Sequence, residues 1–186
     1  MKAGTRALGV AESYRDDQST LAGAVVRASR VLDGLAFGSC TVGGTDATDG
    51  VVDIVATLDR EDVQYVLTAG VALAWYNILD LDRVREAADC PVVAVTFEES
   101  AGLEPALREA FDGAALTERL SAYRALPDRH PVTVNDERVY VRAVGLDPGE
   151  ARDIVRAFTP AGGRPEPLRV ARQAARAADA WHRNAP

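Results

Sequence analysis

The amino-acid sequence predicts a mixed α/β protein built around one sheet. Three apolar, strand-like segments follow one another near the N-terminus, and helical and strand-like segments alternate after them. Strands that are close in sequence usually pair as an antiparallel meander, whereas alternating helices and strands build an α/β layer. The chain has 186 residues and is 47% hydrophobic, which suffices for one domain with a buried core. Because no internal repeat or linker interrupts it, we expect residues 1–186 to form a single domain.

The N-terminal strands are expected at residues 7–11, 21–27 and 31–42, where apolar residues dominate. The first of them is an apolar run that we expect to end at Glu12, Ser13 and Tyr14. Since adjacent strand residues point to opposite faces, the side chains of Ala11 and Glu12 would share a face only if the strand ends or bulges there.

A glycine pair at positions 43 and 44 breaks the third strand, and Thr45 or Asp46 then suits a helix N-cap. Apolar residues at positions 51, 52, 54, 55 and 58 have helical spacing, so we expect a helix over Asp46–Arg60. The same patterns predict the remaining elements: strands at 63–67 and 91–97, a hairpin within 131–144 around Asn135-Asp136, and helices over 75–88, 100–126, 149–158 and 166–183.

The net charge of −7 argues against general attraction to nucleic acid or to an anionic membrane. A phosphate-bearing partner would therefore need a local basic patch. Lys2 is the single lysine, so arginines supply the other twenty basic residues. The acidic balance would also suit a salt-rich cytoplasm.

The two cysteines, Cys40 and Cys90, and the two histidines form no pattern typical of a disulfide framework or a zinc site. We see no signal peptide and no apolar run approaching the ~20 residues of a membrane span, so we expect a cytoplasmic protein. Neither a phosphate-binding P-loop nor a Gly-x-Ser-x-Gly nucleophile elbow is present.

The segment from Gly162 to Arg172 is the most distinctive one. Two prolines flank Glu166 where a helix is expected to start, and a carboxylate is favoured at that end of the helix dipole. Arg169 and Arg172 follow three and six residues later, on roughly the same face. The spacing fits either a capped C-terminal helix or the wall of an anion or metal site.

Four separated segments resemble an archaeal family called domain of unknown function 99. They are Leu8-Gly9-Val10-Ala11-Glu12-Ser13-Tyr14, residues 42–48, residues 70–80, and Arg164-Pro165-Glu166-Pro167-Leu168-Arg169-Val170-Ala171. That family is uncharacterised and is similar to endonuclease V. The resemblance implies a ribonuclease H-like fold with flanking helices, in which three antiparallel strands precede alternating helices and strands.

Endonuclease V uses a divalent metal, Mg²⁺ or Mn²⁺, to cleave nucleic acid near deaminated bases, so the resemblance implies converging carboxylates. The ligand positions implied by the motifs fall on Ala11, Ala69 and Arg172. Alanine offers no ligand atom, and a guanidinium repels a metal ion although it can hold a phosphate. We therefore expect a nucleic-acid or nucleotide binder with a degenerate metal centre, and whether it is an enzyme stays open.

The candidate site residues follow from this comparison. Glu12, Asp46 and Glu166 are the candidate catalytic or anchoring acids, and an ion pair of Glu12 with Arg169 is an equal alternative. The residues proposed to hold phosphate or substrate are Arg169, Arg172, Tyr14, Trp75 and Asn77, with the aromatic rings able to stack on a base.

Two other functions remain open from the sequence. In the first, Glu12, Asp46 and Asp80, with Glu166, bind one Mg²⁺ or Mn²⁺ in a rearranged site that hydrolyses a phosphodiester. In the second, the protein is a non-enzymatic interaction or regulatory protein. Its partner surface would then be the alanine stripe of the last helix, at Ala171, Ala174, Ala175 and Ala178. The oligomeric state is not predicted.

Overall fold

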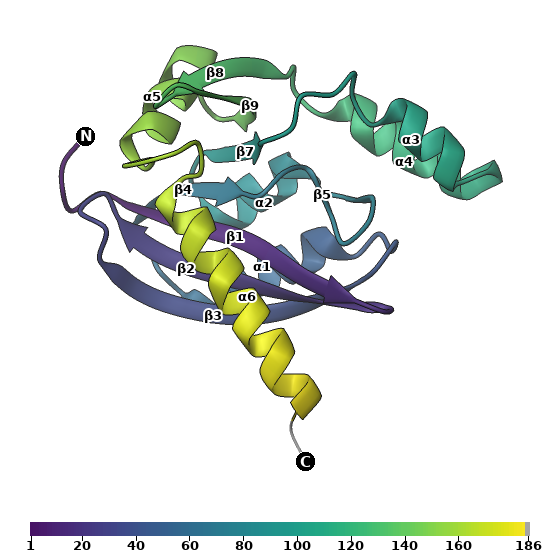
Figure 1. The fold of residues 1–186 in the computed structure, drawn as a ribbon, viewed down its shortest axis with the longest axis horizontal. Helices are drawn as coiled ribbons and strands as arrows, with labels where there is room; N and C mark the ends of the chain where they lie inside the picture. Colours follow the sequence, from purple (N-terminus) through teal and green to yellow (C-terminus); the bar gives the residue numbers. More distant parts are fainter. Residues whose placement is uncertain (185–186) are drawn as a thin grey trace.

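A computed structural model describes residues 1–184 as a seven-stranded mixed sheet with helices on both faces (Figure 1). The strands of this sheet are β1 (Arg6–Arg15), β2 (Gln18–Arg27), β3 (Leu32–Thr41), β4 (Val63–Thr68), β7 (Val92–Thr96), β8 (His130–Val134) and β9 (Glu137–Val144). A separate short hairpin consists of β5 (Ala72–Leu73) and β6 (Asn77–Ile78). The helices are α1 (Ala47–Leu58), α2 (Leu81–Ala88), α3 (Glu104–Ala110), α4 (Gly113–Ala125), α5 (Pro148–Ala157) and α6 (Glu166–Asn184).

The order of strands across the sheet is β3-β2-β1-β4-β7-β9-β8. The predicted antiparallel meander is confirmed, because β1 pairs with β2 and β2 pairs with β3, both antiparallel. On the other side of β1, the strands β4 and β7 run parallel to it. The carboxyl ends of β1, β4 and β7 therefore meet at one edge of the sheet, where open α/β sheets bind their ligands.

Alternating residues of β1 serve two different cores. Leu8 and Val10 pack in one hydrophobic cluster with buried residues of α1 and α2. Ala11 packs on the opposite face, in a cluster that includes Ala171 of α6. In Figure 1, α6 crosses in front of β1 and β2 while α1 and α2 lie behind the sheet.

The helix α6 packs so closely against β1 that it leaves no room for a side chain at Gly9. A side chain on Gly9 would collide with the backbone and ring of Pro167, at the first turn of the helix. Ala171 and Ala175 are fully buried against the sheet further along. The alanine stripe therefore covers the chain's own sheet at these two positions, which removes them from the partner surface considered above.

Two predicted helices are wrong in part. The one expected over 75–88 begins only at Leu81, because Ala74, Trp75 and Tyr76 all have positive φ angles in the turn between β5 and β6. The one expected over 100–126 is divided into α3 and α4, because the backbone is extended at Phe111 and Asp112. The apolar residues in these segments have helical spacing, but some of them belong to turns that interrupt the helices. Among the described residues, no helix is both long and apolar enough to cross a bilayer.

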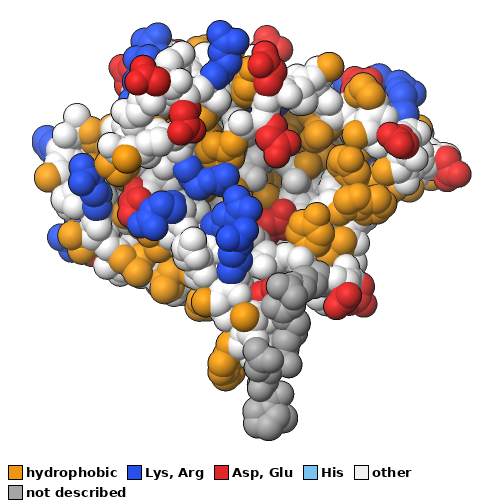
Figure 2. Space-filling view, viewed as in Figure 1, with side chains coloured by type: hydrophobic (Ala, Val, Ile, Leu, Met, Phe, Trp, Pro, Cys, Tyr) orange, Lys and Arg blue, Asp and Glu red, His pale blue; other side chains and the backbone are white. Residues whose placement is uncertain are grey.

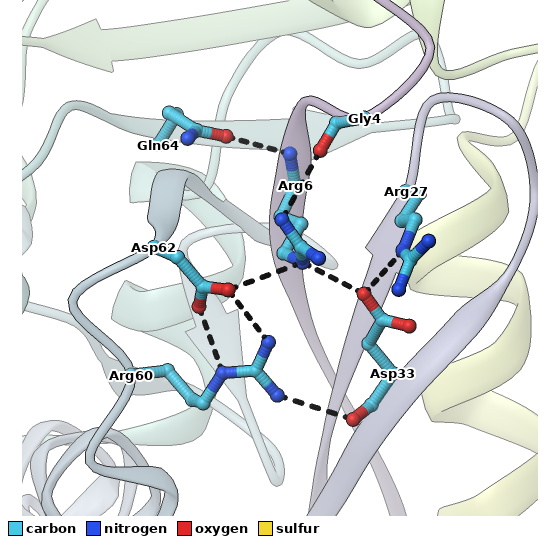
Figure 3. A network of polar contacts seen from close by, with 7 residues as sticks. All are labelled: Gly4, Arg6, Arg27, Asp33, Arg60, Asp62 and Gln64. Atoms are coloured by element: carbon cyan, nitrogen blue, oxygen red, sulfur yellow. Dashed lines mark hydrogen bonds and ion pairs between the residues drawn. The ribbon is translucent and has the colours of Figure 1, made fainter.

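At the opposite end of β1, an arginine–aspartate network joins the start of this strand to its neighbours (Figure 3). Asp33 accepts hydrogen bonds from the Nε atoms of Arg6 at 2.7 Å and Arg27 at 2.5 Å. Asp62 pairs with Arg60, whose Nη1 also donates to the carbonyl of Asp33 at 3.1 Å. The arginines lower the pKa of both aspartates. The network fixes the β3 edge and the loop after α1, and its two aspartates offset most of the charge of its three arginines.

The contact between Gly9 and Pro167 yields a stability prediction. We expect Gly9→Ala to lower the free energy of unfolding by about 1–3 kcal/mol, because the added methyl group overpacks against backbone that cannot yield. Denaturant titration would measure this change.

The matched control for that experiment is Gly4→Ala. A side chain at Gly4 meets no atom within 4 Å, so this variant should retain wild-type stability within experimental error. Equal stability of the two variants would contradict the close packing of α6 on β1.

Candidate arginine-lined cavity

A cavity of about 510 Å³ opens at the edge where β1, β4 and β7 end. Residues directly after or at the end of each strand form its floor: Ala11, Glu12, Ser13, Tyr14, Ala69, Gly70, Val71, Ala72, Val95, Thr96, Phe97 and Glu98. Its volume is in the range of small-ligand pockets. The predicted site therefore has a physical counterpart at the expected edge of the sheet.

Five arginines surround this cavity, against two acidic side chains, Glu12 and Glu98. Two of them, Arg172 and Arg176, lie on α6, and Arg164 lies in the loop before it. Arg129 and Arg142 come from the opposite side, after α4 and in β9. Figure 2 shows a group of basic side chains over the first half of α6, in the middle of the face, with hydrophobic side chains beside it below α3 and α4.

Aromatic rings, rather than carboxylates, hold three of the five arginines. The guanidinium of Arg164 lies 3.7 Å from the centre of the Phe97 ring, and that of Arg129 lies 3.8 Å from the centre of Tyr140. Arg142 lies 5.1 Å from the Tyr123 ring and donates to its hydroxyl at 3.0 Å. These contacts orient the guanidinium groups and leave their charge uncancelled.

Within residues 1–184 as described, none of the five arginines forms an ion pair with an acidic side chain. Burial lowers the pKa of Arg164, and the nearby charges of Arg172 and Arg176 lower it further. Like charges thus lie close together at this cavity, an arrangement that an anion would relieve.

Glu12 lies on the cavity floor and continues β1, which runs on to Arg15 without ending or bulging at this position. Its Oε2 accepts hydrogen bonds from the hydroxyl of Ser19 at 3.0 Å and from the backbone N–H of Ala74 at 2.6 Å. The alternative ion pair of Glu12 with Arg169 does not form, because Arg169 pairs with Glu166. Arg172 is the basic residue that acts on Glu12 electrostatically. Burial raises the pKa of Glu12 and outweighs these three influences, which lower it.

Asp46 and Asn77 form a structural pair away from the cavity lining. Asp46 stands at the N-cap position of α1, yet its carboxylate makes no capping bond there. It accepts instead from the N–H and hydroxyl of Thr41 and from Asn77 Nδ2 at 2.7 Å. Burial would raise its pKa, but these hydrogen bonds prevail and lower it.

The fully buried Asn77 supplies the cap that Asp46 does not, because its Oδ1 accepts from the N–H of Ala47 at 2.9 Å. Its Nδ2 donates to the carbonyl of Thr41 at 3.0 Å. All these bonds serve the loop before α1. The predicted substrate-binding role of Asn77 therefore gives way to a structural one.

The other two predicted acids are also engaged locally. Asp80 caps α2 by accepting from the N–H of Arg83 at 3.0 Å. Glu166 pairs with Arg169 at 2.5 Å and 2.7 Å, and this arginine lowers the pKa of the carboxyl group. Arg169 does not line the cavity, whereas Arg172 does. The structure thus separates the two arginines that the spacing placed on one face.

Comparison with known proteins identifies the family. A family model described as Endonuclease dU matches residues 3–179. The chain belongs to the Endonuclease dU family. A relative named UPF0215 protein, from Pyrobaculum calidifontis, is 33% identical over 168 residues, which cover 88% of this chain and 91% of the relative.

Solved structures place this family member among endonuclease-V-like proteins. A protein of unknown function from Archaeoglobus fulgidus superposes with a TM-score of 0.81 at 25% identity, covering 94% of this chain and 98% of the other. Endonuclease V of Ciona intestinalis, in complex with inosine-containing DNA, gives a TM-score of 0.63 at 11% identity, with coverage of 95% and 86%. The predicted ribonuclease H-like fold is confirmed, and the chain is an endonuclease-V-like protein.

The divalent metal implied by the resemblance to endonuclease V does not fit the residues of this Endonuclease dU family member. All three implied ligand positions, Ala11, Ala69 and Arg172, line the cavity, but two offer no ligand atom and the third is a cation. Glu12, Asp46, Asp80 and Glu166 do not replace them. Among the described residues, no group of three or more His, Cys, Asp or Glu is placed to hold a metal ion.

Four of the five cavity arginines were not among the predicted site residues: Arg129, Arg142, Arg164 and Arg176. Arg164 lies within the segment from Gly162 to Arg172, and Arg176 follows Arg172 at helical spacing, so both had an available signal in the sequence. Arg129 and Arg142 have no such signal, because only the return of β9 beside β7 brings them to this edge. Of the two aromatic residues predicted to contact a ligand, Tyr14 lines the cavity, whereas Trp75 lies in the β5–β6 hairpin outside the lining.

The burial of Glu12 predicts how stability depends on pH. Because its folded-state pKa lies above its ordinary value, the ionised form is disfavoured in the folded protein, and stability falls as pH rises from about 4.3 through the folded pKa. Gln retains the oxygen that accepts from Ser19 and Ala74. We therefore expect Glu12→Gln to raise the Tm at pH 7 and to match wild type below about pH 4.

Thermal unfolding followed by circular dichroism across this pH range would check the result. The control is Glu98→Gln, which removes a carboxylate from an exposed position of the same cavity and should not reproduce the pH-dependent gain. A Glu12→Gln protein no more stable than wild type at pH 7 would contradict the prediction.

Proposed function

We propose that this endonuclease-V-like protein binds a nucleic-acid strand or nucleotide by its phosphate, in the cavity at the ends of β1, β4 and β7. The observation that carries the proposal is the set of five arginines around that cavity, none of which has an acidic ion-pair partner among the described residues. In a chain of net charge −7, such a concentration of basic side chains is the local patch that a phosphate requires.

Guanidinium groups suit this role because their planar N–H donors match phosphate oxygens in pairs. The arginines also lie on both sides of the cavity, with Arg164, Arg172 and Arg176 on one side and Arg129 and Arg142 on the other. A ligand crossing the edge of the sheet would contact both groups. The acidic surface elsewhere would repel a polyanion, so binding would be confined to this place.

The positive charge of Arg172 could perform one of the two roles of a bound metal ion but not the other. A fixed cation can neutralise and orient a phosphate, but it cannot activate water as a bound metal does. We therefore propose a binding protein with weak or no cleavage in the manner of endonuclease V. The name of its family and the DNA complex of the Ciona enzyme support nucleic acid as the ligand class.

We also propose a cytoplasmic location for this single domain. Both cysteines are free and buried. Burial raises the pKa of Cys40 to about 12 and that of Cys90 to about 11, so neither thiol is poised for disulfide exchange. Free thiols are typical of reducing compartments.

Replacing Arg172 should weaken nucleic-acid binding. We expect Arg172→Gln to reduce affinity about tenfold or more and to lower the salt dependence by about 0.7, the slope for one phosphate contact of a single strand. Fluorescence anisotropy of a labelled single strand, titrated at several salt concentrations, would measure both quantities.

Arg169→Gln is the matched control, because Arg169 is on the same helix but is paired with Glu166 outside the cavity lining. It should leave affinity and slope unchanged. Unchanged binding by the double variant Arg164→Gln/Arg172→Gln would overturn the proposal.

A cleavage assay tests the degenerate metal centre separately. With Mg²⁺ or Mn²⁺ present, we expect no cleavage of DNA or RNA that contains inosine, nor of DNA that contains dU. Metal-dependent cleavage that Glu12→Gln abolishes would instead favour the rearranged carboxylate site.

A further inference from the structure

The turn between β5 and β6 presents an aromatic side chain on an unusual backbone. Ala74, Trp75 and Tyr76 have φ angles of +43°, +60° and +63°, three consecutive non-glycine residues in the left-handed region. Trp75, at the centre of this run, is 46% exposed. Such a conformation persists only where the surroundings impose it, and it is found at ligand-contacting segments.

Hydrogen bonds on both sides of the turn hold it in place. The carbonyl of Ala74 accepts from the N–H of Gly43 at 2.7 Å, and its N–H donates to Glu12 at 2.6 Å. At the base of the hairpin, Leu79 donates to the carbonyl of Val71 at 2.8 Å. The tip that carries Trp75 is therefore fixed to the loop before α1 and to the cavity floor.

The indole of Trp75 packs against two other aromatic rings. Its ring centre is 5.4 Å from that of Tyr76 and 5.2 Å from that of Phe111. Gly43 provides the space, because a side chain there would lie 2.8 Å from the indole. These neighbours orient the ring and still leave nearly half of the residue open to solvent.

A buried arginine, Arg119, packs against this aromatic cluster. Arg119 is only 7% exposed, and its guanidinium lies 4.1 Å from the centre of the Phe111 ring. It donates to the carbonyls of Gly43 and, at 3.2 Å, Gly44. Its Nε has no hydrogen-bond partner, and within the described part of the chain it forms no ion pair. Arg119 is thus a positioning residue that joins α4 to the loop before α1, which contains Gly43 and contacts the indole.

The aromatic surface adjoins the arginine-lined cavity. Val71 and Ala72, which lead into the hairpin, line the cavity, and so does Glu12, to which the backbone of Ala74 is bonded. Unpaired nucleic acid is bound by an exposed ring beside cationic side chains, because bases stack on the ring and phosphates contact the cations. Here the exposed ring lies beside guanidinium groups that have no acidic ion-pair partner among the described residues.

We propose that Trp75 is a stacking platform for an unpaired base of a strand whose phosphates lie in the arginine-lined cavity. The inference rests on the proposed function and narrows it to single-stranded or locally unpaired nucleic acid. In a duplex, base faces are covered by neighbouring base pairs, so only an unpaired base can stack on the indole.

The chain has two tryptophans, Trp75 and Trp181, so a Trp181→Phe background makes Trp75 the sole indole fluorophore. We expect a single strand of mixed sequence to quench its emission. Two probes carry similar phosphates without an accessible base: an abasic strand of equal length and a duplex whose two ends are closed by non-nucleotide linkers. Both should produce little or no quenching while anisotropy still reports salt-dependent binding.

The outcomes separate the two proposals. Binding of the single strand without quenching, or equal quenching by the abasic strand, would overturn the stacking platform and leave phosphate binding intact. Failure of all three probes to bind would overturn the proposed function and the platform with it. Self-association through Trp75, measured by light scattering without nucleic acid and abolished by Trp75→Ala, would assign the exposed ring to a protein contact and also overturn the platform.

Substitutions provide a second readout. Trp75→Ala should lower affinity for the base-bearing strand about 5- to 100-fold and leave affinity for the abasic strand unchanged. Trp75→Phe keeps an aromatic face and should retain most of the affinity.

Arg119→Met should reduce quenching in the Trp181→Phe background without changing the slope of affinity against salt, because Arg119 orients the platform and contacts no phosphate. Circular dichroism would verify that each variant is folded. Equal affinity of Trp75→Ala and wild type for the base-bearing strand would overturn the inference.

Discussion

The close approach of α6 to β1 is the constraint on which the site depends. The helix begins at Glu166 and meets the strand at Gly9, where a larger side chain would collide with Pro167. This contact, continued by the buried Ala171 and Ala175, fixes how far the helix lies from the sheet and how it crosses it. The arginines at 164, 172 and 176 reach the cavity because their helix is seated in this way.

The second constraint is how the protein concentrates positive charge without neutralising it. Several arginines elsewhere are paired with carboxylates, as in the network of Asp33 and Asp62 and in the pair of Glu166 with Arg169. Around the cavity, aromatic rings replace carboxylates as the partners of Arg129, Arg142 and Arg164. A ring orients a guanidinium and shields part of it from water, but it leaves the full charge for a ligand. The acidic balance of the whole chain therefore coexists with a basic site.

Glu12 connects the cavity to the hairpin that carries Trp75. Its carboxylate accepts from the backbone of Ala74, so the residue that resembles a nuclease acid acts here as a structural link. Asn77 also has a structural role, because it caps α1 from a different segment of the chain. Asp46 is then free to accept a hydrogen bond from Thr41. These polar residues thus fix loops, and arginines outnumber carboxylates in the lining of the cavity.

Local pattern sufficed for most of the secondary structure. The alternation of apolar residues predicted the strands of the meander, and helical spacing predicted α1, α5 and α6 to within a few residues. It failed at Trp75, because the apolar residues there surround a left-handed turn whose conformation is imposed by Gly43 and Glu12 from other segments. Periodicity records which residues are apolar, and it cannot distinguish a helix from a turn that buries the same side chains.

The sequence by itself also determined that two implied ligand positions lack a suitable side chain, since Ala11 and Ala69 carry no side-chain ligand atom in any fold. Only the tertiary structure decided which charges are available. Glu166 and Arg169 neutralise each other three residues apart, whereas Arg129 and Arg142 line the same cavity as Arg172 although they are distant from it in the sequence. Spacing along a helix constrains neighbours within a few turns. A site assembled from the ends of separate strands and helices depends on contacts between residues far apart in the chain, and these form only when the sheet is complete.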